Sequence, residues 1–126
     1  MSRAPSLRLR KAWIACGYGF IALVIYLSLT PSPIPAPSIE GVKTGHVIAY
    51  AWLVLWFSQA YPRVRVRLAW ATAFVLMGVA LEYLQGMTGY RTFAYSDMWD
   101  NAIGVAVGLA MASTTLGRLF PELASA

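Results

Sequence analysis

Charged side chains are scarce in this sequence. Asp, Glu, Lys and Arg make up 12% of its 126 residues, whereas apolar residues make up 59%, and the mean hydropathy is +0.59. Soluble domains normally carry about 25% charged residues. This balance argues against a soluble domain and indicates a membrane protein.

Cysteine and histidine occur once each. The single thiol, Cys16, cannot form an intrachain disulfide, and we expect it to be a small residue inside the fold. One cysteine and one histidine, His46, without repeated ligand spacing do not make a zinc site. The sequence also lacks the G-x-S-x-G pattern of serine hydrolases, so we interpret Ser96 as a turn or cap residue. We therefore predict no metal and no cofactor.

Long apolar runs are what the sequence has in abundance. A membrane-spanning helix needs roughly 17 to 25 predominantly apolar residues, and four stretches meet this length, at 12–30, 44–61, 68–85 and about 98–117. The first run is too long for the apolar core of a cleaved signal peptide, which is the alternative for the N-terminus. The loops between the runs are too short for a second domain. We predict an all-α membrane protein with four transmembrane helices in one domain, 1–126.

The basic residues are distributed unevenly between the loops, and they give the chain a net charge of +5. One set lies before the first run, between the second and third, or after the fourth: Arg3, Arg8, Arg10, Lys11, Arg63, Arg65, Arg67 and Arg118. The other side holds Lys43 and Arg91. By the positive-inside rule, both termini are cytoplasmic in a multi-pass protein of the cytoplasmic (inner) membrane. This topology explains the basic charge without nucleic acid as a partner.

Polar residues gather at the outer ends of the predicted helices. From the second helix to the fourth they are Lys43, His46, Tyr50, Glu82, Gln85, Arg91, Asp97, Asp100 and Asn101. The first three share one helical stripe because they are spaced i, i+3 and i+7. Ionisable residues within membrane spans are costly and mark functional sites. We therefore expect one polar cluster, contributed by several helices.

The acidic members of the cluster have two explanations. Asp97 and Asp100 fit the capping of the fourth helix, because acids near a helix N-terminus satisfy free N–H groups and oppose the dipole. Glu82 fits a buried ion pair with Lys43, Arg91 or protonated His46, which would hold the outer helix ends together. Alternatively, Glu82 transfers protons together with His46.

Small residues continue the fourth helix below Asn101. Gly104, Gly108 and Ala112 lie on the same stripe, and the G-x-x-x-G spacing lets another helix backbone approach closely. We expect this face to pack inside the bundle rather than to form a dimer. That packing would carry the polar residues above it into the same groove.

The order of these motifs, K-x-x-H-x-x-x-Y, then E-x-x-Q, then R-x-x-x-x-x-D-x-x-x-N-x-x-G-x-x-x-G, resembles the VanZ-like family of small bacterial membrane proteins. The matching positions are Lys43, His46, Tyr50, Glu82, Gln85, Arg91, Asp97, Asn101, Gly104 and Gly108. The resemblance is strongest over 30–112 and departs at Val42, where family members often have an acid. It implies a four-helix membrane domain and a family whose founding member is associated with resistance to the lipoglycopeptide antibiotic teicoplanin.

Three functions remain open at this point. In the leading hypothesis, Lys43, Arg91 and two helix N-termini bind an anionic lipid or lipid-linked envelope precursor at the outer leaflet. Glu82, Gln85 and Asn101 would orient this ligand. In the second, an intramembrane enzyme uses His46 and Glu82 as acid or base on a phosphate-linked lipid. In the third, the cluster holds the helices together and the surface recruits partner membrane proteins or a second copy of the chain. We favour binding over catalysis, and a transporter is disfavoured because the inner halves of the helices lack a charged path.

Overall fold

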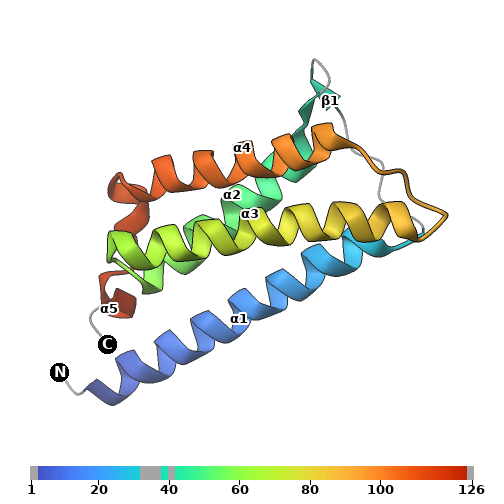
Figure 1. Cartoon of the computed structure of the whole chain (residues 1–126). Coiled ribbons are helices and arrows are strands. Elements are labelled where there is room, and N and C mark those ends of the chain that lie inside the picture. The colour runs from blue at the N-terminus through green and yellow to red at the C-terminus, as the bar shows by residue number, and fades with distance from the viewer. Residues whose placement is uncertain (1–2, 32–37, 40–41, 125–126) are drawn as a thin grey trace.

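Four long helices lie side by side in the computed structural model, which describes residues 3–31, 38–39 and 42–124 (Figure 1). They are α1 (Arg3–Leu29), α2 (Thr44–Ala60), α3 (Val64–Met87) and α4 (Tyr95–Ala112). Successive helices run in opposite directions, so the described ends of the chain lie at the same end of the bundle (Figure 1). We call this the terminal end and the opposite one the hairpin end. The prediction of an all-α fold with four long helices is confirmed.

Short elements lie at both ends of the bundle. At the hairpin end, β1 (Ser38–Ile39) pairs with β2 (Val42–Lys43) in antiparallel register, with Ser38 opposite Lys43. At the terminal end, the 3-10 helix η1 (Thr115–Arg118) and the short helix α5 (Pro121–Ala124) follow α4. The sequence predicted a plain loop before the second helix, and residues 32–37 and 40–41 of that loop lie outside the described part.

The fourth helix ends earlier than predicted, at Ala112 rather than near residue 117. The hydroxyl of Ser113 donates to the carbonyl of Ala110 at 2.7 Å, and the hydroxyl of Thr114 donates to the carbonyl of Met111 at 2.5 Å. Hydroxyl side chains of this kind compete with the backbone for helical acceptors. Local side-chain chemistry therefore ends α4 within an apolar run.

The core is built around α2. Leu53, Val54 and Phe57 are at most 1% exposed, and they pack against Phe74 of α3 and Val105 of α4. The most extensive packing joins α2 to α4. Burial on this scale stabilises a fold by roughly 1.5 to 3 kcal/mol for each large apolar side chain in water.

The glycine face of α4 explains how closely α2 approaches. A Cβ atom at Gly104 would lie 2.5 Å from the carbonyl oxygen of Val47, and one at Gly108 would lie 2.8 Å from that of Ala51. Ala112 continues this face and is 2% exposed. The G-x-x-x-G stripe thus packs inside one chain, as the sequence predicted.

At the terminal end, α1 is attached to α2 by two tryptophans. The rings of Trp13 and Trp56 stack with centroids 3.7 Å apart and planes 5° apart. Each indole N–H donates to the backbone carbonyl of the other residue, at 2.8 Å in both directions. The pair satisfies both indole donors while burying two aromatic faces.

Two of the helices are long and apolar enough to cross a membrane by length and composition, α1 over Leu7–Leu29 and α3 over Val64–Met87. Only 6% of the first apolar window and 22% of the second are buried inside the bundle, so most of their side chains point outward. Cys16 is one of them, and the expectation that it lies inside is wrong. Its neighbour Gly17 takes the contact with α2, where a Cβ would lie 2.6 Å from the ring of Phe57, so Cys16 faces away.

Candidate functional site

Lys43 is the most prominent polar residue of the hairpin end. It is the N-cap residue of α2, and its ammonium lies 2.9 Å from Oδ1 and 3.0 Å from Oδ2 of Asp97 on α4. The side chain of Lys43 is 47% exposed, whereas that of Asp97 is 4% exposed. A half-exposed cation is therefore held by a buried carboxylate.

The acids at the start of α4 both bind Lys43, the N-cap residue of α2. The backbone N–H of Lys43 donates to Oδ2 of Asp100 at 3.0 Å, so Asp100 caps the N-terminus of α2 from a neighbouring helix. The N-cap of α4 is Ala94, which has no side-chain cap. The prediction that Asp97 or Asp100 caps α4 locally is therefore wrong as to the N-cap bond. Asp97 does lie in the first turn of α4, where its charge opposes the helix dipole.

His46 and Tyr50 continue the stripe of Lys43 along α2. Nδ1 of His46 lies 2.9 Å from Oδ1 of Asn101 on α4. The ring of Tyr50 is buried, and its hydroxyl has no hydrogen-bond partner among the described residues. Gly78 of α3 makes room here, because a Cβ at this position would lie 3.0 Å from Nδ2 of Asn101 and 3.4 Å from the Tyr50 hydroxyl.

Glu82 is 1% exposed and serves the backbone of α4. Its Oε1 accepts the N–H of Ala94 at 2.6 Å, which satisfies the N-cap residue that no local side chain serves. Within the described part of the chain Glu82 forms no ion pair. The expected ion pair with Lys43, Arg91 or His46 is wrong. Asp97 binds the ammonium of Lys43, Asn101 lies against the ring of His46, and Arg91 binds carbonyls at the end of α1.

Gln85 and Arg91 bind the C-terminal end of α1. Nε2 of Gln85 donates to the carbonyl of Ser28 at 2.6 Å. Nη1 of Arg91 donates to the carbonyls of Thr30 at 2.8 Å and Leu27 at 3.2 Å. These carbonyls form the negative end of a helix, which favours a cation. The structure thus assigns Arg91 to α1 and not to a shared anion site with Lys43.

Arg67, which the sequence reasoning counted only as a loop charge, performs the same task at the terminal end. Its Nη1 donates to the carbonyl of Ala112 at 2.9 Å, and Nε donates to that of Tyr61 at 2.8 Å. Its Nη2 donates to the carbonyls of Ser58 at 2.8 Å and Gly117 at 3.0 Å. One guanidinium therefore closes the C-terminal ends of both α2 and α4.

Gln59 was also missed. It is 4% exposed, its amide N–H donates to the carbonyl of Leu116 at 2.7 Å, and its amide oxygen accepts the N–H of Leu119 at 3.0 Å. An amide inside an apolar run was the available signal, and it is the signal that singled out Gln85. Gln59 of α2 thus holds η1 and the residue that follows it against the terminal end of the bundle.

The fold defines the chain as a bundle of four long helices with an apolar outer surface, whose helix ends are capped by side chains of neighbouring helices. Comparison with protein-family models, curated proteins and solved structures finds no match for this chain.

Proposed function

We propose that the chain is a multi-pass protein of the cytoplasmic membrane, with all four long helices spanning the bilayer and both termini in the cytoplasm. Outward-facing apolar side chains on every helix support this, including Ile48 on α2 at 66% exposed and Ile103 on α4 at 44%. With 17 and 18 residues, α2 and α4 are about 26 Å long, close to the thickness of a bilayer core. The capping of helix ends by side chains of neighbouring helices also fits a lipid environment, because lipid tails cannot form hydrogen bonds with free backbone N–H and C=O groups.

We propose further that the protein is VanZ-like. Four of the residues that carry the resemblance form two pairs between α4 and the start of α2, Lys43 with Asp97 and His46 with Asn101. In the proposed topology these pairs face the outer leaflet. The family's association with an antibiotic that acts on that side is the reason to propose an envelope function, with resistance itself as a secondary expectation.

The function we propose is the binding of an anionic lipid headgroup or lipid-linked envelope precursor at Lys43. The observation that carries it is the 47% exposure of the Lys43 side chain beside a buried Asp97. An ammonium has three N–H donors, and the exposed side can still meet an acceptor from outside.

An apolar groove supports a lipid rather than a free anion. It has a volume of about 250 Å³ and is lined by residues of α2 and α4, among them Val47, Ile48 and Val107. Val47 lies about one helical turn below Lys43, since it is four positions further along the chain. A headgroup at Lys43 would therefore leave an acyl chain free to follow this groove.

The remaining polar residues support the structural hypothesis. Each of them forms a hydrogen bond with the backbone of another segment. Asp100 accepts the N–H of Lys43 before α2, and Glu82 accepts the N–H of Ala94 before α4. Gln85 donates to the carbonyl of Ser28 in α1. We assign them to holding the bundle together rather than to orienting a ligand. Catalysis by His46 and Glu82 together is less well supported, because Glu82 is bound to a backbone N–H.

Lipid retention by purified variants tests the proposal. Lys43→Ala should lower the affinity for phosphatidylglycerol about five-fold, since one cation near a lipid surface contributes about 1 kcal/mol. Asp97→Asn should raise the affinity, because it removes the carboxylate that competes for the ammonium, and Lys43→Arg should retain binding. Native mass spectrometry in detergent measures all three.

A matched control is Lys11→Ala, which removes one charge from an exposed position on α1 at the terminal end. If Lys43→Ala binds phosphatidylglycerol as well as Lys11→Ala does, the binding proposal is wrong. A purely structural role would lower the thermal stability of Lys43→Ala and Asp97→Asn alike and would leave lipid affinity unchanged in both.

A further inference from the structure

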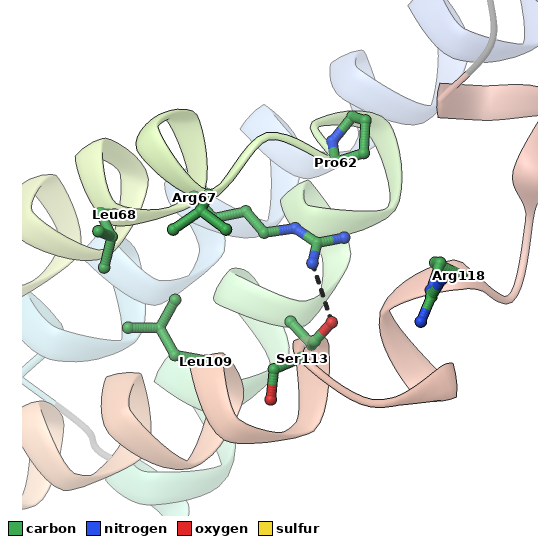
Figure 2. A pocket seen from close by; sticks show the side chains of 8 residues that line it. Pro62, Arg67, Leu68, Leu109, Ser113 and Arg118 are labelled. Carbon is green, nitrogen blue, oxygen red and sulfur yellow. Dashed lines mark hydrogen bonds between the residues drawn. The ribbon is translucent and has the colours of Figure 1, made fainter.

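A second cavity lies at the terminal end, away from Lys43 and its partners. It has a volume of about 500 Å³ and lies between the start of α3 and the end of α4. Val64, Leu68 and Leu109 contribute apolar walls, and Arg67, Ser113 and Arg118 contribute polar ones. In Figure 2, Leu68 and Leu109 lie on one side of the cavity, and Arg118 and the guanidinium of Arg67 lie on the other.

The two arginines of this cavity differ in what they bind. The guanidinium of Arg67 is committed to four backbone carbonyls. Arg118 is exposed, and its guanidinium makes no hydrogen bond or ion pair with any other described residue. The two charges interact unfavourably with each other, and no acidic residue lines the cavity. Among the described residues that line the cavity, the polar side therefore carries positive charge and no carboxylate.

We infer that this cavity binds an anionic phospholipid of the leaflet at the terminal end. The phosphate would accept hydrogen bonds from Arg118, whose planar guanidinium suits a bidentate contact with phosphate. An acyl chain would lie against Leu68 and Leu109, and Leu68 is 50% exposed at the outer surface. Basic pockets between membrane helices on the cytoplasmic side are known to hold such headgroups.

The inference depends on the proposed membrane placement but not on the Lys43 site. Arg67 acts here as a positioning residue, because its bonds to the carbonyls of Ala112 and Gly117 hold the wall that carries Arg118. A lipid fits better than a free phosphate because the apolar wall continues outward from the charged one.

The test uses the purified full chain carrying Lys43→Ala, so that the site at the hairpin end does not contribute. Binding of phosphatidylglycerol and phosphatidylcholine is compared by native mass spectrometry after delipidation and re-addition. Arg118→Ala should weaken phosphatidylglycerol binding about five-fold, and Lys11→Ala should leave it nearly unchanged. Leu68→Trp, which partly fills the apolar side, should also weaken it.

Three results would overturn the inference. They are equal binding by the Arg118→Ala and Lys11→Ala variants, equal retention of phosphatidylcholine, and competition by glycerol phosphate as strong as that by the whole lipid, which would indicate a simple anion site. A failure of the function proposed for Lys43 would be seen in a different comparison. In that case the parent chain and its Lys43→Ala variant would bind phosphatidylglycerol equally well.

Discussion

Replacing Arg67 by alanine should destabilise the bundle more than any other loss of a single charge at the terminal end. The guanidinium binds carbonyls contributed by α2, by the residue that follows α2, by α4 and by η1. These carbonyls belong to helix ends that have no further helical N–H to accept from. Truncation to alanine leaves all four without their donor.

The magnitude follows from the hydrogen bonds. A hydrogen bond to a charged group contributes about 1.5 to 3 kcal/mol, so four independent ones would contribute roughly 6 to 12 kcal/mol. Water can reach some of the freed carbonyls, and removing Arg67 also removes the cost of desolvating its charge, so we expect a loss of about 3 to 5 kcal/mol. Arg67→Lys should recover about half of the loss, because one ammonium cannot span carbonyls that surround a planar guanidinium.

Thermal unfolding in detergent, followed by tryptophan fluorescence, measures this effect. Arg63→Ala and Arg65→Ala are matched controls, since both residues are exposed in the same segment and each change removes the same charge. They should alter stability by less than about 0.5 kcal/mol. If the midpoint of Arg67→Ala falls with those of the controls, Arg67 is only a topological charge and the capping argument is wrong.

Two further variants test the packing and the polar cluster. Gly104→Ala should destabilise the fold by about 1 to 3 kcal/mol, because the new Cβ would lie 2.5 Å from the carbonyl oxygen of Val47. Gly19→Ala is the control and should not destabilise the fold, because a Cβ there would meet nothing within 4 Å. Equal unfolding midpoints for the two variants would contradict the close approach of α2 to α4. Glu82→Gln should lower the free energy of unfolding by less than about 1 kcal/mol, because an amide oxygen can still accept the N–H of Ala94. Glu82→Leu should lower it by about 2 kcal/mol, because that N–H then loses its acceptor. The reverse order would indicate that the charge of Glu82, and not its hydrogen bond, stabilises the fold.

Much of the fold could be predicted because it depends on neighbours along the chain. Apolar runs of helical length located four helices, although capping by Ser113 and Thr114 ended α4 early. The spacing of Gly104 and Gly108 predicted close packing against another helix within the bundle. Such features follow from length and periodicity, which a sequence displays directly.

The sequence predicted which polar residues lie at the hairpin end, but it did not predict which partner each of them binds. The sequence placed Lys43 and Asp97 at the same end of the bundle, where they do form an ion pair. It could not tell that Arg91 serves the end of α1 instead. Lys43 and Arg91 are both basic residues at the hairpin end, and residue type alone cannot tell which of them binds Asp97.

The sequence by itself determined that the chain forms four long apolar helices with polar residues concentrated at one end and basic residues at the other. Only the tertiary structure decided which partner each polar group takes: that Arg67, and not Arg65, closes two helix ends, and that Asp100 caps α2. The physical reason is distance along the chain, because the bond from Arg67 to Ala112 joins residues 45 positions apart and the bond from Lys43 to Asp100 joins residues 57 positions apart. Whether two such groups meet depends on the rotation and depth of one helix against another, and side-chain packing between helices sets both.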